Sequence, residues 1–307
     1  MSKIDRILIG CNKNDLHLTK ICVASIRYWC QDIPILLLKD ELNGLFKTKE
    51  IEEAWNVKIL NGPLKKLGWG INTLLPLTIK SGKRCLFLDA DIVMLGDVIS
   101  YLEQIESSII VSSPDRIDNM KAHMESAYFS LKNIRHYDAD YQVPDFLFNC
   151  GHLVFDEGII DQLAFDEFID WTSIPPRIKD KKTFICADQS LLNFILPKME
   201  KAGKLKIAKS HFNIWGFDYE AMDFISLKDI KIKKSNPKLI HWAGIKTAHI
   251  SGMTRADILA FYEDIYYSKI KLGSLRKHYS HFIQHKKEYV LTFKKALVWV
   301  RDNVLKS

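Results

Sequence analysis

RCLFLDADIVMLGDV, residues 84–98, places two aspartates, Asp89 and Asp91, at the end of a continuous apolar run. A short run that is apolar on both faces predicts a strand covered on both sides, as in a parallel sheet flanked by helices. Carboxylates are rarely buried unless a partner replaces their lost hydration. The segment therefore predicts a central strand with a polar ligand at its end.

The first half of the chain alternates strand and helix patterns around this segment. Apolar runs predict strands at 6–11, 33–38, 57–60 and 85–91, and helical patterns occupy 16–29, 47–55 and 71–82. This alternation predicts an α/β fold with a Rossmann-like, doubly wound and mostly parallel sheet. Ligands of such sheets bind beyond the carboxyl ends of the strands, which is where Asp89 and Asp91 fall.

The second half of the chain is less regular. Strands are expected at 107–113, 146–156 and 237–244, with a helix near 161–171. A polar stretch up to about residue 145 is expected to form loops or short helices, and Pro175 and Pro176 mark a break. The order of these strands in the sheet is left open.

The composition is that of a globular protein. The 307 residues are 47% hydrophobic, which is enough for a sizeable core. The N-terminus lacks the apolar stretch of a signal peptide, and no uncharged run reaches the roughly 18 residues of a membrane span. The six scattered cysteines, none in a CxxC pair, are expected to be reduced thiols rather than disulfides or a zinc site. We therefore expect a cytoplasmic protein.

Basic charge is concentrated at the C-terminus. Ten Lys and Arg residues and two acids lie in 268–307, so this segment carries +8 and the rest −1, for a formal net charge of +7. Within it, Phe293, Leu297, Val300 and Val304 recur at helical spacing, which predicts an amphipathic helix. Such basic helices lie on anionic membrane surfaces, here the inner face of a membrane. The alternative is a helix packed on the body with a solvated basic face, and nucleic-acid binding has no recognised module in its favour.

Asp89 and Asp91 by themselves allow three interpretations. Carboxylates at a strand end suit Mg²⁺ or Mn²⁺, which keeps open positions for substrate phosphates. A solvated loop or a helix N-cap would also explain them, and Asp97 is another candidate for the cap. The segment DADIV also resembles the D-x-D-x-T/V motif of haloacid-dehalogenase-type phosphatases, in which Asp89 would be the nucleophile. That family also needs a later acidic pair after a lysine, typically G-D-x-x-x-D or D-D, and neither pattern occurs downstream.

Four segments in order, LFLDADIVMLGDV, FNCGHLVFD, DQSLLN and HWAG, resemble glycosyltransferase family 8, which includes glycogenin and bacterial lipopolysaccharide galactosyl- and glucosyltransferases. The resemblance runs from about Ile7 to about Lys246. It implies a GT-A fold, a nucleotide-sugar donor that is usually a UDP-sugar, a Mn²⁺ or Mg²⁺ cofactor, and transfer with retention at the anomeric carbon. We accordingly expect a catalytic domain at 1–250 and a helical basic extension at 251–307.

The resemblance assigns a metal site. Asp89 and Asp91 match the family's metal-binding D-x-D, with Ala90 between them at the nucleotide sugar. His241 matches the histidine that completes the protein's share of the metal shell, and its imidazole must be neutral to donate a lone pair. A lone histidine at a strand end is otherwise a satisfied core residue, but the HxxG pattern ending at Gly244 favours a ligand.

The nucleotide base is matched by a segment after the first strand. NDLH resembles the family's N-D-x-Y, so the resemblance places Asn14, Asp15 and His17 at the base, with an imidazole in place of tyrosine. As an alternative, Asn14 or Asp15 caps the helix that follows. Both roles are compatible.

The diphosphate is matched by the segment after His241. Gly244 lets the backbone approach phosphate, and Lys246 adds a positive charge. The family usually reads HxxGxxKPW, whereas this chain reads HWAGIKTAHI, so the lysine lies one position early and no Pro-Trp follows. His249 is a substitute candidate for the phosphate contact.

The donor sugar is matched by two further segments. Asn149 in FNCG and the Asp188-Gln189 pair in DQSLLN match positions that line the sugar pocket. Asp188 would accept hydrogen bonds from sugar hydroxyls, and Gln189 would face the anomeric carbon opposite the leaving group. Because glutamine is a poor nucleophile, we expect front-face substitution through an oxocarbenium-like state, with the leaving phosphate as base. The structural alternative places Asp188 in the first turn of a helix.

One position near the donor departs from the family. About seventeen residues before the D-x-D, the family tends to have Arg or Lys, and this chain has Asn72 and Thr73. The sequence thus predicts a metal-dependent, retaining hexosyltransferase that uses UDP-glucose or UDP-galactose and a glycan or lipid-linked acceptor, such as a growing lipopolysaccharide. The alternatives are a non-catalytic protein that binds nucleotide sugars or glycans on the same fold and, third, a phosphatase.

Overall fold

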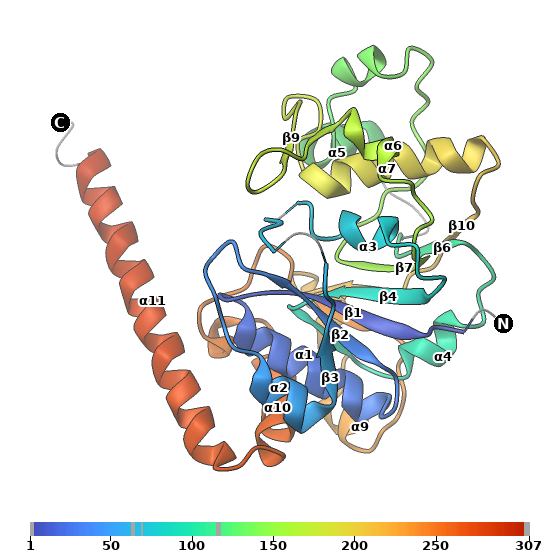
Figure 1. Cartoon of the computed structure of the whole chain (residues 1–307). Coiled ribbons are helices and arrows are strands. Elements are labelled where there is room, and N and C mark those ends of the chain that lie inside the picture. Colours follow the sequence, from blue (N-terminus) through green and yellow to red (C-terminus); the bar gives the residue numbers. More distant parts are fainter. Residues whose placement is uncertain (1–2, 63–64, 69, 115–117, 304–307) are drawn as a thin grey trace.

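Seven strands form the central sheet of the computed structural model, which describes residues 3–62, 65–68, 70–114 and 118–303 (Figure 1). Their order is β10-β6-β7-β4-β1-β2-β3. Neighbours pair in parallel, except that β7 runs antiparallel to both β4 and β6. The strands are β1 Arg6–Asn12, β2 Ile35–Asp40, β3 Val57–Ile59, β4 Arg84–Asp89, β6 Ile109–Val111, β7 His152–Asp156 and β10 Ile207–Lys209. The predicted α/β fold with a mostly parallel sheet is confirmed.

Two smaller sheets accompany the central one. The first has the order β11-β12-β5, with β12 parallel to β11 and antiparallel to β5, and the second is the antiparallel pair β8-β9. Their strands are β5 Ile92–Met94, β8 Ile169–Asp170, β9 Arg177–Ile178, β11 Asn213–Trp215 and β12 Leu239–His241. The first of these sheets continues from the segment that carries the two aspartates.

Helices lie on both faces of the central sheet (Figure 1). Helices α1, α2, α9 and α10 lie below the sheet in the view, and α3, α5, α6 and α7 lie above it. The helices are α1 Leu16–Trp29, α2 Lys49–Trp55, α3 Leu74–Thr78, α4 Val98–Leu102, α5 Met120–Ala127, α6 Leu163–Asp166, α7 Ala187–Lys201, α8 Tyr219–Asp223, α9 Leu227–Lys231, α10 Ala256–Ser268 and α11 Gly273–Asn303, with 3-10 turns η1 Asn133–His136 and η2 Ile250–Gly252.

Each face of the sheet has its own apolar core, and the strand alternation divides the residues between them. In β4, Leu86 and Leu88 belong to the core under α1 and α10, whereas Cys85 and Phe87 belong to the core under α3 and α7. All four side chains are fully buried. Successive side chains of a strand point to opposite faces, so a strand covered on both sides must be apolar throughout.

The strand predicted at 146–156 is shorter in the structure and begins at His152. Phe148 is buried, but its backbone N–H donates to the Asn193 side chain at 3.1 Å and its carbonyl accepts from the same amide at 2.9 Å. These bonds take the place of hydrogen bonds to a neighbouring strand. A buried backbone N–H or carbonyl needs a hydrogen-bond partner, and a side chain can supply it as well as a strand can. The helix predicted near 161–171 is also short, since Ile169–Asp170 pairs with β9 instead.

Helix α10 belongs to the main body. Tyr262 is fully buried, and its hydroxyl donates to the Met94 carbonyl at 2.6 Å and accepts from the Trp29 indole at 3.0 Å. A tyrosine that is apolar at its ring and satisfied at its hydroxyl is a strong anchor between a helix and its neighbours. The functional division of the chain at residue 250 stays a prediction, while the packing places α10 in the same core as α1.

Helix α11 extends along one side of the molecule (Figure 1). Its first turns are joined to the body by ion pairs of Arg276 with Glu50 and of Lys277 with Glu263. Of the four apolar residues expected to form one face, Phe293 is 65% exposed, and the side chains of the other three lie outside the described residues. No described helix is both long enough and apolar enough to cross a bilayer.

Candidate metal centre and its surroundings

Asp89, Asp91 and His241 gather at the carboxyl end of β4. His241 Nε2 lies 3.6 Å from Asp89 Oδ2 and 3.4 Å from Asp91 Oδ1. One ligand atom from each residue lies within 4.8 Å of the others, and among the described residues this is the one cluster with such geometry. Two carboxylates and an imidazole are ligands that Mn²⁺ and Mg²⁺ accept. The residues that the sequence predicted to share a metal are therefore together in space.

Strand pairing produces this convergence. Strand β12 pairs antiparallel with β5, and the register places His241 opposite Ile92, next to Asp91 in the chain. The Trp242 N–H donates to the Asp91 carbonyl at 3.1 Å, which fixes the two backbones at the site. Antiparallel partners opposite each other have Cβ atoms about 5 Å apart. The imidazole consequently reaches the carboxylates although 150 residues separate it from Asp91 in the sequence.

The two carboxylates differ in their electrostatics. Burial and the neighbouring charge of Asp91 raise the pKa of Asp89, although 40% of the Asp89 side chain is exposed and solvent moderates the effect. Burial also raises the pKa of Asp91, but His241 and Lys246 outweigh it, so the net shift is downward. Asp91 is thus held as the anion, and the site carries concentrated negative charge suited to a divalent cation.

Lys246 is the cation nearest to this charge. Its Nζ lies 3.3 Å from Asp91 Oδ2 and 3.0 Å from Asp15 Oδ2. Burial lowers the pKa of Lys246, but the attraction of Asp91 and Asp15 outweighs burial and raises it. Lys246 therefore stays charged at the edge of the site, even though it lies one position early relative to the family pattern.

The imidazole of His241 is oriented by aromatic neighbours that the sequence did not predict. The Trp215 ring stacks on it with centroids 5.5 Å apart, and the His152 ring meets it edge-on at 5.4 Å. Burial strongly lowers the pKa of His152, so this ring is neutral and adds no charge behind the site. His152 directly follows the FNCG segment and could have been found from it, whereas nothing in the sequence around Trp215 marks that residue.

Asn149 and the start of α7 lie next to Asp89. Asn149 Nδ2 donates to Gln189 Oε1 at 2.6 Å, and Asn149 Oδ1 accepts from the Gly151 N–H at 2.8 Å. Asp188 lies in the first turn of α7, where its carboxylate accepts from the Gln189 N–H at 2.8 Å. Burial and the Asp89 charge raise the pKa of Asp188 to about 7, despite hydrogen bonds that include one from Thr73. The three residues predicted for the sugar pocket thus lie in one network.

Asn72 replaces the expected cation and is packed tightly. Its amide lies against Gly10, where an added Cβ would clash with Asn72 Nδ2. Asn72 Oδ1 is buried and has no hydrogen-bond partner within the described part of the chain. A buried amide oxygen without a partner is costly, so this atom is ready to accept a hydrogen bond from a ligand.

The segment predicted at the nucleotide base lies at the start of α1. Asp15 is the N-cap residue, but its carboxylate makes no capping bond to any described backbone N–H and instead contacts Asn12 Nδ2 at 2.8 Å and Lys246. Burial lowers the pKa of His17 to about 4, so its imidazole is neutral. Asn14 is exposed. The side-chain capping alternative is therefore wrong for Asp15, whose charge is directed to the site.

Lys246 and His249, the two residues considered for a phosphate contact, point to different parts of the structure from the loop after β12. Gly244 is exposed with a φ of 73°, and Lys246 faces Asp91. His249 is buried and faces α11, where its Nε2 lies 3.3 Å from His281 Nδ1 and its ring stacks on His285 at 3.9 Å. The structure thus brings Lys246 to the aspartates and joins His249 to the C-terminal helix.

Comparison with known proteins identifies the fold. The sequence matches no family profile and no curated protein. The bifunctional glycosyltransferase WbbM aligns with 87% of this chain at 12% identity and a TM-score of 0.54, and the chain spans 50% of WbbM. The galactosyltransferase LgtC, solved with donor and acceptor sugar analogs, aligns with 86% of this chain at 14% identity and a TM-score of 0.53, over 95% of LgtC. At these identities the likeness establishes a GT-A type fold.

Gly151→Ala tests the geometry of the metal centre. A Cβ at Gly151 would clash with Asp89 Oδ2 and lie 2.6 Å from His241 Cε1, so both ligands would have to move. We expect Mn²⁺ affinity, measured by calorimetric titration, to fall about 10- to 100-fold, as for other residues that position metal ligands. Gly203→Ala is the control for backbone strain alone, because its φ of 69° disfavours alanine while a Cβ there meets no described atom within 4 Å and touches no ligand. Unchanged affinity in Gly151→Ala would contradict the assigned ligands.

The contacts among His249, His281 and His285 lead us to expect that the protein loses stability in acid. Burial, His285 and His281 lower the pKa of His249 below its ordinary 6.5, outweighing the opposite influence of Glu288 and Glu263. The folded protein then binds fewer protons at this group than the unfolded chain, so stability falls as pH drops through about 6.5. Urea unfolding at pH 7.5 and 5.5 should show a smaller loss in His249→Gln than in the parent.

The control for this comparison is His278→Gln, which removes an exposed histidine of α11, the helix that also carries His281 and His285. Its pH dependence should match the parent, because His278 makes no ring contact with His249, His281 or His285 in the described part of the chain. An equal pH dependence in all three proteins would show that His249 is not a source of acid sensitivity.

Proposed function

We propose that this chain is a metal-dependent glycosyltransferase that moves a hexose from a nucleotide sugar to a glycan or glycolipid acceptor. The observation that carries the proposal is the convergence of Asp89, Asp91 and His241 at the carboxyl end of β4. The fold around them is one that WbbM and LgtC share. LgtC is a galactosyltransferase solved with donor and acceptor sugar analogs, which supports a sugar-transfer role for this kind of fold.

The three ligand residues would hold Mn²⁺ or Mg²⁺. Their donor set fits, because Asp91 is 4% exposed and anionic while His241 is 1% exposed and offers Nε2 toward both carboxylates. A bound divalent cation supplies stabilisation of the charge that develops on a diphosphate leaving group. Lys246 adds a fixed positive charge at the same edge, with Gly244 leaving the loop backbone open to phosphate.

Residues next to Asp89 would orient the sugar. Asp188 would accept hydrogen bonds from sugar hydroxyls, and Gln189, held by the Asn149 amide, would face the anomeric carbon. A glutamine amide is a weak nucleophile, which favours retention by front-face substitution. The bond from the anomeric carbon to the leaving phosphate oxygen breaks as the acceptor oxygen bonds on the same face. The acceptor proton passes to that phosphate oxygen.

The donor is proposed to be UDP-glucose or UDP-galactose. Asn14, Asp15 and His17 would contact the base, and a neutral imidazole at His17 is suited to stacking on uracil. Ala90, between Asp89 and Asp91 in the chain, would also contact the donor. Asn72 offers a hydrogen-bond acceptor to the donor in place of a cation. The catalytic part would span residues 1–250.

Asp91→Asn tests the enzyme against its alternatives. Removing one ligand charge should lower Mn²⁺-dependent hydrolysis of UDP-glucose or UDP-galactose on the order of 100-fold or more, measured as released UDP. Chelation of the parent should have the same effect, reversed by added Mn²⁺. Asp223→Asn, at an exposed position in α8, is the matched control.

Different outcomes of that experiment favour different functions. Donor binding without hydrolysis or transfer, across several nucleotide sugars, would favour the non-catalytic binding protein. Phosphate release through a trapped aspartyl-phosphate at Asp89 would favour the phosphatase. The site itself argues against the latter, because the described residues bring an imidazole rather than a second acidic pair to the aspartates.

We further propose that α11 contacts an anionic membrane, which suits a lipid-linked acceptor such as a growing lipopolysaccharide. The described part of the helix exposes large apolar side chains at helical spacing beside basic ones, as amphipathic membrane helices do. These exposed side chains are Leu275, Tyr279, Phe282, Tyr289, Val290 and Phe293.

Phe282→Ser combined with Tyr289→Ser tests the membrane contact in the intact chain. Both side chains are more than half exposed, so the exchange removes apolar area from the proposed contact without opening the core. Sedimentation with phosphatidylglycerol-containing vesicles should fall at least about tenfold, since each buried apolar side chain contributes on the order of 1–2 kcal/mol. Equal sedimentation of parent and variant would remove the proposal.

A further inference from the structure

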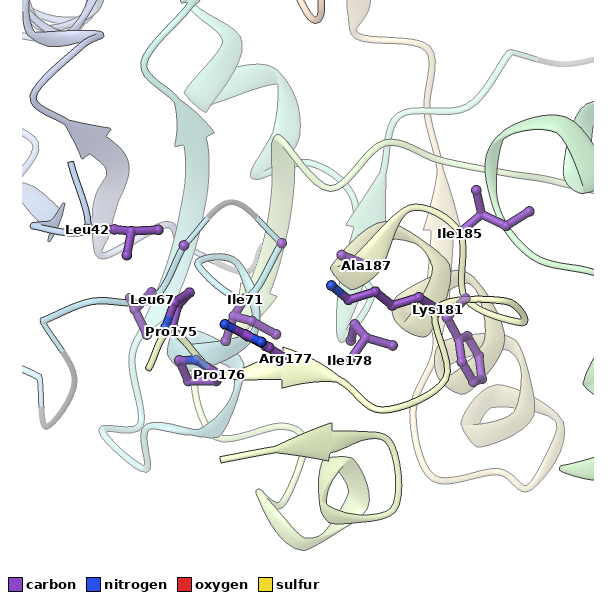
Figure 2. Close-up of a pocket in the computed structure, with 13 residues that line it drawn as sticks. Leu42, Leu67, Ile71, Pro175, Pro176, Arg177, Ile178, Lys181, Ile185 and Ala187 are labelled. Atoms are coloured by element: carbon purple, nitrogen blue, oxygen red, sulfur yellow. The ribbon is translucent and has the colours of Figure 1, made fainter. Parts of the chain in front are cut away.

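A cavity lies at the start of α7 (Figure 2). Its volume is about 400 Å³, within the range of small-molecule sites. Its lining comes from Leu42, the turn around Ile71, the stretch from Pro175 to Ile178, and the residues that lead into Ala187. None of the residues proposed to hold the metal, the base or the donor sugar lines it.

The cavity and the proposed donor site share a wall. Ala187 lines the cavity and directly precedes Asp188 and Gln189, while Ile71 lines it and directly precedes Asn72. The wall is tight at Gly70, where an added Cβ would clash with Ala187 Cβ. A molecule in the cavity would therefore lie next to the residues proposed to hold the donor sugar.

Hydrogen bonds to Asp40 fix the turn that contains Leu67 and Gly68. The Asp40 carboxylate, at the end of β2, accepts from the Leu67 N–H at 3.2 Å and from the Gly68 N–H at 3.1 Å. Asp40 is buried and Leu67 is fully buried, so these bonds hold the turn against the sheet. The cavity is thus lined by a fixed segment of backbone, which a specific binding site requires.

The lining combines apolar surface with two cations. Ile71, Ile178 and Phe184 supply buried apolar side chains. Figure 2 shows the Lys181 side chain reaching toward Ala187 and the Arg177 guanidinium lying near Ile71. No acidic side chain of the described residues lines the cavity, and neither cation forms an ion pair with a described carboxylate. Arg84, a cation that approaches the core elsewhere in the body, does have such a partner in Asp156.

We propose that this cavity binds the acceptor, and that Arg177 and Lys181 select an acceptor sugar carrying an anionic group, a phosphate or a carboxylate. The proposal rests on the proposed transferase function and names the substrate class of the neighbouring site. An apolar wall suits the face of a sugar ring, and a guanidinium offers two parallel hydrogen bonds to a phosphate or carboxylate. A lysine adds a point charge to either group.

Binding of three simple sugars tests the proposal. Glucose, glucose 6-phosphate and glucuronic acid are titrated into the full chain in the presence of Mn²⁺ and saturating UDP, which keeps the anionic probes out of the diphosphate position. We expect at least one anionic sugar to bind about tenfold or more tighter than glucose, as charge-assisted hydrogen bonds provide. Preference for glucose 6-phosphate identifies a phosphate group, and preference for glucuronic acid identifies a carboxylate.

Variants assign the preference to the two cations. The double variant Arg177→Ala, Lys181→Ala should bind all three sugars with the affinity of glucose, whereas Lys182→Ala should keep the preference, because Lys182 is exposed nearby without lining the cavity. Both positions of the double variant are exposed, so the fold should be unaffected. Mn²⁺-dependent hydrolysis of the nucleotide sugar should also be unchanged.

The outcomes separate this inference from the proposed function. Equal binding of the three sugars by the parent, or an anionic preference that survives in the double variant, would overturn the inference and leave the transferase in place. Loss of donor hydrolysis in the double variant would also overturn it, since the cations would then serve the donor. Absence of donor hydrolysis in the parent would instead count against the proposed function.

Discussion

The contact between His241 and the Asp89–Asp91 pair is the constraint around which the rest of the structure is arranged. It joins the end of β4 to the end of β12, which lies about 150 residues later in the sequence. The antiparallel pairing of β5 with β12 makes it possible, because the register puts His241 opposite the residue that follows Asp91. The site therefore exists only when the small sheet is formed, and folding and function depend on the same backbone hydrogen bonds.

Gathering two carboxylates at one point opposes folding, and the surrounding residues reduce that cost in different ways. Lys246 places a positive charge 3.3 Å from Asp91, and the aromatic rings of Trp215 and His152 hold the imidazole without adding charge. Gly151 leaves the space that the ligands occupy. Residues that destabilise the fold, such as two neighbouring carboxylates, are expected where a protein binds a ligand.

The loop after β12 connects the C-terminal helix to this site. Lys246 at one end of the loop faces the aspartates, and His249 at the other end packs between His281 and His285 of α11. The same helix is joined to α2 and α10 by Arg276 and Lys277. A helix that exposes apolar side chains to its surroundings is thus attached to a loop proposed to contact phosphate, which ties the position of the helix to the site.

The sequence by itself predicted the α/β class and the limits of α1, and its resemblance to a known family predicted the three residues of the candidate metal centre. The spacing of apolar residues and the position of a residue at a strand end can be read from a short segment. The prediction for β4 is confirmed because this strand is covered on both faces. Only the tertiary structure decided which residues surround these ligands. The contact of Trp215 with His241 and the cavity at the start of α7 are formed by segments far apart in the chain, so both depend on strand order and register. Asn193 shortened the predicted strand at 146–156 for the same reason, since its side chain satisfies a backbone that it meets only after folding.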